Sequence, residues 1–175
     1  MRGAGYGPFV ADDMGAASGD RGSPGPTLLV SACLLGVACT HDATARRSDD
    51  VLALAAVHGA RLVPVCPETA GGLPTPRPAA ERSVVDGRVR TEAGVEVTDA
   101  YERGADHAVA LARATGAAAA VLKARSPSCG CREVYDGSFT RTRVAGEGVT
   151  AERLRLAGLE VRSEEDLSGW SPAPG

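Results

Sequence analysis

The sequence predicts a Rossmann-like α/β domain with a mainly parallel sheet and helices on both faces. Short apolar runs alternate with helical segments along the chain, which favours parallel strands joined by crossover helices. The runs are largely apolar, as in strands buried on both faces. The length of 175 residues suits one such domain.

Four strands are expected. The first is the run 27–33, and the second is 61–66, where Pro64 places the strand near an edge or an irregularity. The third covers 117–123, and a short last strand covers 159–162. The first run is not followed by a G-x-G-x-x-G dinucleotide signature, so NAD is not implied.

Three helices are expected between capping and terminating residues: Ser48 or Asp49 to about His58, Thr98 as N-cap to Gly116, and 149–157. A local hairpin is expected over 83–91, because Asp86-Gly87 separates two β-branched runs.

The chain is expected to comprise a flexible extension over 1–26, the α/β domain over 27–167 and a flexible tail over 168–175. Both ends are rich in small residues and proline and show no helical or strand period. Trp170, the single tryptophan, is expected to be exposed in that tail, with docking on the α/β domain as the alternative.

The composition narrows the classes of partner. A net charge of −3 and an aromatic content of 3% provide neither a basic footprint nor a base-stacking platform, so a small molecule is favoured over duplex nucleic acid. No membrane partner is expected, because no apolar stretch approaches the roughly 18 residues of a span. We expect a cytoplasmic protein whose five cysteines are reduced thiols, metal ligands or catalytic groups. The sequence does not predict an oligomeric state.

Three of these cysteines, Cys33, Cys66 and Cys129, lie where three predicted strands end. Because the carboxyl ends of parallel strands meet at one edge, the thiols are expected to converge on one pocket. Their wide separation differs from the paired spacing of structural zinc sites and suits three-point attachment of a larger inorganic unit. Three thiolates on an iron-sulfur cluster would leave one iron open to substrate. The alternative is that each cysteine is a small buried hydrophobic residue.

Several sequence blocks resemble the signature of the thiouracil desulfidase family, long catalogued as a domain of unknown function. The resemblance covers about residues 27–165. It is carried, in order, by Ser31-Ala-Cys-Leu-Leu-Gly36, Pro64-Val-Cys-Pro-Glu68, Gly71-Gly-Leu-Pro-Thr-Pro-Arg-Pro78, Arg90-Thr91, Val97-Thr98, Ser126-Pro-Ser-Cys-Gly130, Tyr135-Asp-Gly137 and Gly146-Glu-Gly-Val-Thr150.

The resemblance implies a [4Fe-4S] cluster held by the same three cysteines. It also implies non-redox conversion of a thiolated pyrimidine, such as thiouracil or a thiouridine nucleotide, to its oxo form with release of sulfide. Glu68 matches the family's catalytic acid/base, and a serine of the loop containing Ser126 and Ser128 matches the residue that positions substrate or water.

Three further residues are candidates for substrate binding. Arg77 can pair with a phosphate or a pyrimidine carbonyl, or be a solvated arginine in a rigid turn. Lys123 can carry the same roles or be a strand-end charge. Asp42 is retained from a family block that tends to be Cys-Arg-Tyr-Asp-Gly, where this chain has Cys39-Thr-His-Asp-Ala43. Thr40 and His41 replace the basic and aromatic residues of that block. If the loop contacts the base or ribose, this replacement would alter the substrate preference.

Two cysteines remain. Cys39 is expected to be a packing thiol near the cluster. Cys131 is a candidate fourth ligand or second sulfur-handling thiol, although a fourth ligand would close the site that the chemistry needs. The alternative functions are an iron-sulfur or zinc sensor or carrier without turnover, and a cysteine-based thiol transferase. Neither the form of the substrate, whether base, nucleoside or nucleotide, nor the ring position of its sulfur is predicted.

Overall fold

The apolar runs form one parallel sheet in the computed structural model, which describes residues 25–173. Its strands are β1 (Thr27–Ser31), β2 (Arg61–Val65), β5 (Ala119–Leu122) and β8 (Glu160–Ser163), in the order β2-β1-β5-β8 with every pair parallel. Strand β2, which contains Pro64, is an edge strand, as the proline predicted. The expected extension over 1–26 lies almost wholly outside the described residues.

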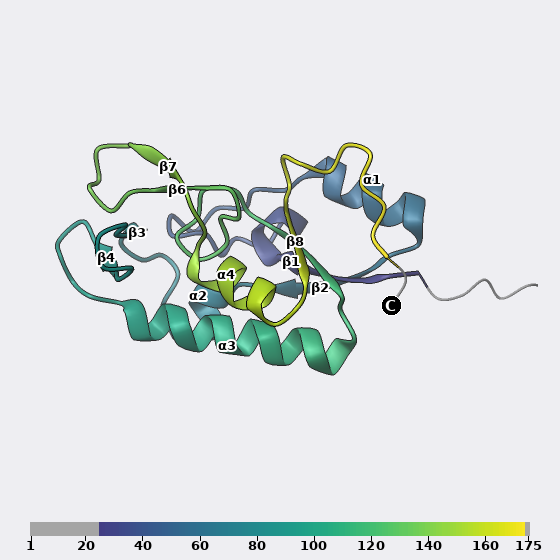
Figure 1. Ribbon diagram of the computed structural model, residues 1–175, viewed down its shortest axis with the longest axis horizontal. Coiled ribbons are helices and arrows are strands. Elements are labelled where there is room, and N and C mark those ends of the chain that lie inside the picture. Colours follow the sequence, from purple (N-terminus) through teal and green to yellow (C-terminus); the bar gives the residue numbers. More distant parts are fainter. Residues whose placement is uncertain (1–24, 174–175) are drawn as a thin grey trace, which may run out of the picture.

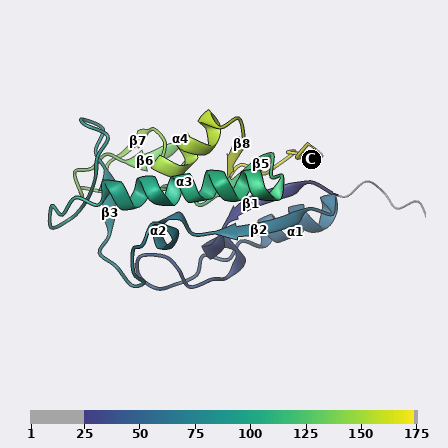
Figure 2. The same ribbon diagram turned by 90° about the horizontal axis from the view of Figure 1, so that it is seen from below.

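Helices cover both faces of this sheet (Figures 1 and 2), so the predicted fold class is confirmed. Helix α1 (Asp49–His58) packs on one face, whereas α3 (Thr98–Thr115) and α4 (Val149–Leu156) pack on the other. Side chains that alternate along β1 enter the two cores. Leu28 and Val30 lie with residues of α1, and Leu29 lies with residues of α3 and α4.

The helix ends follow local chemistry. The Ser48 side chain accepts a hydrogen bond from Val51 N at 3.4 Å, and Gly59 ends α1 in the left-handed region at φ 59°. The expectation that Thr98 is the N-cap of α3 is wrong, because Val97 occupies that position. The Thr98 hydroxyl instead accepts from Val89 N at 3.0 Å, which ties the helix to a neighbouring hairpin.

Two antiparallel hairpins lie beyond the carboxyl ends of the sheet strands (Figure 1). The first joins β3 (Ala80–Arg82) to β4 (Val89–Thr91), so its first strand begins earlier than predicted and Asp86-Gly87 lies in the connecting loop. The second joins β6 (Glu133–Tyr135) to β7 (Arg143–Ala145) and was not anticipated from the sequence.

Two one-turn helices follow β1 and β2 directly. They are η1 (Ala32–Leu35) and α2 (Pro67–Ala70). Each begins at the carboxyl edge of the sheet, so their side chains are held close to the strand ends.

Trp170 is only 7% exposed and belongs to the core on the α1 side of the sheet, so its predicted exposure is wrong. The Arg162 guanidinium lies 5.6 Å from its ring centroid, a cation–π arrangement. No helix within residues 25–173 is long and apolar enough to cross a membrane.

Candidate active site

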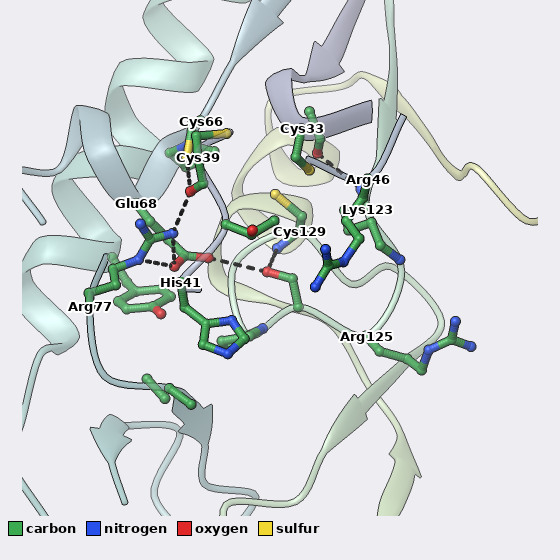
Figure 3. Close-up of a pocket in the computed structure, with 18 of the residues that line it drawn as sticks. Cys33, Cys39, His41, Arg46, Cys66, Glu68, Arg77, Lys123, Arg125 and Cys129 are labelled. Carbon is green, nitrogen blue, oxygen red and sulfur yellow. Dashed lines mark hydrogen bonds and ion pairs between the residues drawn. The ribbon is translucent and has the colours of Figure 1, made fainter. Parts of the chain in front are cut away.

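A cavity of about 370 Å³ opens at the carboxyl edge of the sheet. Its walls come from the segments that follow β1, β2 and β5, with the two hairpins contributing on the far side. Figure 3 shows that side chains distant in sequence point into this space. The position agrees with the general tendency of open α/β sheets to bind ligands beyond their strand ends.

Four thiols line the cavity: Cys33, Cys39, Cys66 and Cys129. Cys33 lies in η1 after β1, Cys66 follows β2, and Cys129 lies in the loop after β5. Cys39 comes from the loop after η1, and its carbonyl oxygen accepts a contact from Cys66 Sγ at 3.7 Å. The structure therefore brings the three predicted ligands together and adds a neighbouring thiol, as expected for Cys39.

Burial controls the protonation of these thiols. It raises the pKa of Cys33 to about 11 and that of Cys39 to about 12, in both cases reinforced by Cys66. Burial also raises the pKa of Cys129 well above its ordinary range. Binding of a metal would therefore have to displace protons from them.

The arrangement of the donors suits a group larger than one ion. Among the described residues, no three His, Cys, Asp or Glu side chains are placed to hold a single metal ion. Thiols from three separate segments around one cavity instead fit a multi-iron cluster with sulfur ligands.

Glu68 and Arg77 form a buried ion pair on the wall of this cavity. Arg77 Nη2 lies 2.6 Å and Nε 2.7 Å from Glu68 Oε2. Arg77 Nη1 donates to Pro74 O and Thr75 Oγ1, both at 3.1 Å, and Nη2 also donates to Cys39 O at 3.0 Å. The guanidinium thus makes four hydrogen bonds and an ion pair within the protein, and these contacts direct it toward Glu68 and the loop backbone rather than toward the substrate contact that the sequence suggested.

The charge on Arg77 is secured by its partner. Burial acts to lower the pKa of the guanidinium, but the Glu68 carboxylate more than offsets this, and the net effect raises the pKa. Arg77 therefore stays charged and holds one carboxylate oxygen of Glu68 in place, while Oε1 lies toward Ser126.

The two serines of the 126–128 loop are in different environments. Ser126 lines the cavity, and its Oγ lies 3.4 Å from Glu68 Oε1 while accepting from Ser128 N and Cys129 N at 3.1 Å each. Ser128 is fully buried, and its hydroxyl pairs with Thr150 Oγ1 at 2.9 Å. Only Ser126 is placed to act on a bound molecule.

Lys123 lines the cavity, whereas Asp42 does not. Lys123 Nζ is held at 2.5 Å by Glu164 Oε1. Asp42 accepts from Thr40 Oγ1 and Thr44 Oγ1, and these bonds lower the pKa of its carboxyl. Asp42 thus shapes the loop from which His41 and Arg46 line the cavity.

Cys131 is separated from the other thiols. It is buried in the core on the α3 side and borders a different cavity, next to Arg132 and Asp166. The structure therefore does not place Cys131 with the candidate ligands, although it stands only two residues after Cys129.

Four other residues that line the cavity were not among the predicted site residues: Tyr101, Glu81, Tyr135 and Phe139. Tyr101 lies in α3, is 2% exposed and adjoins Glu68. Burial and the nearby Glu68 carboxylate raise the pKa of its phenol. A buried tyrosine hydroxyl usually has a polar partner, and that was the available signal.

Comparison with known proteins agrees with this site. The 2-thiouracil desulfurase family matches residues 28–166. The uncharacterized protein YbbK of Bacillus subtilis (strain 168) is 38% identical over 149 residues, which make up 81% of this chain and 97% of that protein. The solved structure of the [4Fe-4S]-dependent thiouracil desulfidase TudS is 43% identical, with a TM-score of 0.75, covering 81% of this chain and 93% of that chain. The resemblance noted in the sequence is confirmed, and this chain belongs to the 2-thiouracil desulfurase family.

Proposed function

We propose that this protein is a [4Fe-4S]-dependent desulfidase that converts a thiolated pyrimidine, as free base or nucleotide, to its oxo form and releases sulfide without net redox change. Cys33, Cys66 and Cys129 would hold the cluster. The name of the solved relative supports the cofactor and the thiouracil substrate. The observation that carries the proposal is the meeting of three thiols, from three strand ends, beside a paired carboxylate.

The bound cluster would supply a thiophilic Lewis acid that polarises the carbon–sulfur bond. Glu68 would take a proton from the attacking water and return it to a ring nitrogen. Its carboxylate has the support that such a task needs, because Arg77 fixes one oxygen and Ser126 lies next to the other. Because its guanidinium is engaged by Glu68 and by protein oxygens, Arg77 acts as a positioning residue.

Ser126 would orient the substrate or the water. Two backbone N–H groups hold its oxygen in place, which leaves the hydroxyl proton free to point toward Glu68 or a bound oxygen. Lys123, Arg46 and Arg125 line the same cavity and would bind pyrimidine carbonyls or the phosphate of a nucleotide.

The test is an anaerobic assay on protein reconstituted with iron and sulfide. After incubation with 2-thiouracil, 4-thiouracil or their nucleotides, sulfide is measured together with the matching oxo product, which is uracil from a free base and a uridine nucleotide from a nucleotide. Equal amounts of both products are expected. Replacement of Cys33, Cys66 or Cys129 by serine should abolish the reaction together with the visible absorbance of the cluster.

Cys131→Ser is the matched control, because this thiol borders another cavity. It should retain both cluster and activity. A brown, cluster-loaded protein that releases no sulfide from any of these substrates would overturn the proposal in favour of a sensor or carrier.

A further inference from the structure

The loop of the second hairpin brings an aromatic side chain to the cavity. This loop, residues 136–142, connects β6 to β7, and its Phe139 is half-buried and lines the cavity. Tyr101, another aromatic residue of the cavity wall, is only 2% exposed and offers no free ring face, and the ring of Tyr135, also in the wall, carries a polar hydroxyl. Phe139 is therefore better placed to offer an apolar ring surface to a ligand.

The backbone at Phe139 has an uncommon conformation. Its φ is 58°, in the left-handed region, where a bulky side chain is a genuine outlier. Arg141 follows at φ 62°, so the loop turns sharply twice. Such outliers persist only where the surroundings impose them, and they concentrate at ligand sites.

Contacts with the first hairpin hold the loop in this conformation. Glu81 of β3 is 9% exposed, and its Oε2 accepts from Gly137 N at 3.1 Å and from Phe139 N at 3.0 Å. A Cβ at Gly137 would lie 2.5 Å from Ser83 Cα, so the loop is seated closely against the first hairpin. A buried carboxylate is destabilising unless it is hydrogen-bonded. Both hydrogen bonds that Glu81 accepts here come from the 136–142 loop and fix its conformation.

We propose that Phe139 forms the stacking face for the pyrimidine ring of the substrate and that Glu81 is the positioning residue that holds it there. This inference rests on the proposed function. A pyrimidine is a flat conjugated ring, and stacking on an aromatic side chain is a general means of holding one. Stacking would also fix the plane of the ring, and hence the direction of its sulfur. Lys123, Arg46 and Arg125 would bind the carbonyl groups of the ring.

The experiment compares the equilibrium binding of uracil and 5,6-dihydrouracil to the cluster-loaded protein by calorimetry. The two molecules carry the same carbonyl and N–H groups, but only uracil is flat and conjugated. The ratio of their dissociation constants therefore isolates the contribution of the ring face from general damage to the site.

Wild-type protein should prefer uracil, and Phe139→Leu should reduce that preference about tenfold, because leucine keeps the apolar volume but not the flat face. Phe139→Tyr should restore the preference, and Thr140→Ala, an exposed neighbour in the same loop, should leave it unchanged. In turnover, Phe139→Leu should raise KM for thiouracil more than it lowers kcat.

The positioning role of Glu81 is tested by comparing a substitution that keeps the acceptor oxygen with one that removes it. Because both backbone donors meet the same oxygen, Glu81→Gln keeps an acceptor and should retain the uracil preference, whereas Glu81→Ala should lose it. The double variant Glu81→Ala/Phe139→Leu should lose no more of the uracil preference than either single variant does. A protein that desulfurises thiouracil but shows the same binding ratio after Phe139→Leu would overturn the stacking role alone. Protein that binds uracil with the wild-type ratio but forms no sulfide would instead count against the proposed function.

Discussion

The guanidinium of Arg77 donates to acceptors in three different segments, and this decides what the residue can do. Its sequence position, in a Gly/Pro-rich loop after Cys66, suggested a substrate contact. That loop instead folds back so that Arg77 meets Glu68 and the carbonyl oxygen of Cys39. Sequence alone could not predict this, because a buried arginine and a solvated one occupy the same kind of loop.

Replacing Arg77 by lysine should lower kcat by about 100-fold, since a single ammonium cannot reproduce the five-donor fork and a small displacement of Glu68 suffices for such a loss. Arg77→Met should also destabilise the fold by about 3–5 kcal/mol, because it leaves Glu68 buried without its partner. The measurements are steady-state kinetics and denaturant unfolding. Arg47→Lys, at an exposed pair with Asp49, should change neither.

The two loop serines should separate catalysis from stability. Ser126→Ala should lower kcat by about tenfold or more with little effect on unfolding, because its hydroxyl faces Glu68 and the cavity. Ser128→Ala should leave kcat nearly unchanged and cost about 1–3 kcal/mol, because it leaves the buried Thr150 hydroxyl without its partner. Kinetics and thermal unfolding on both variants check this, and equal kinetic losses would contradict the assignment.

At the scale of elements, the site depends on how closely α2 approaches α3. A Cβ at Gly104 in α3 would lie 1.9 Å from Pro67 O, and one at Gly71 would lie 1.9 Å from Ala100 O. Both glycines are therefore required for close approach of two backbones, and that approach places Glu68 beside Tyr101.

Gly104→Ala should destabilise the protein by about 1–3 kcal/mol, although alanine is the better helix former by about 1 kcal/mol. The overlap with Pro67 O outweighs the gain in propensity and should also lower kcat by displacing Glu68. Unfolding and activity should be measured beside Ala110→Gly, an exposed position on the same helix where only propensity acts. Stabilisation by Gly104→Ala would contradict the packing argument.

The elements differ in how far the sequence predicts them. The long helix over Thr98–Thr115 has a clear apolar face and a glycine at its end, so its sequence pattern is enough to predict it. Helix α2 has a single turn, and the strands of the second hairpin have three residues each, which is too short for a period to show. Phe139 lies in the loop of the second hairpin, and Glu81 lies in β3 of the first hairpin, which also has only three residues, so neither could be assigned to the cavity from local pattern.

For the molecule as a whole, the parallel sheet made the site predictable. Placing Cys33, Cys66 and Cys129 after three strands requires only the rule that parallel strands share a carboxyl edge. The same rule says nothing about Trp170, because its burial depends on a chain segment with no secondary structure that passes near α1.

Trp170→Ala should lower the free energy of unfolding by about 3 kcal/mol or more, because a buried ring leaves the core. Within residues 25–173 its indole N–H has no hydrogen-bond acceptor. Trp170→Phe should therefore lower the free energy of unfolding by less than Trp170→Ala does. Since Trp170 is the single tryptophan, its fluorescence in the wild type monitors this contact directly. A red-shifted native emission, typical of an exposed indole, would contradict the buried position.

The wide separation of the three sulfur donors has a consequence for biosynthesis. A ribosome-bound chain offers the first two donors early, but the third emerges only after the long helix and the strand that follows it. On the proposed function, the inorganic core can gain all three protein ligands only after most of the polypeptide has been synthesised.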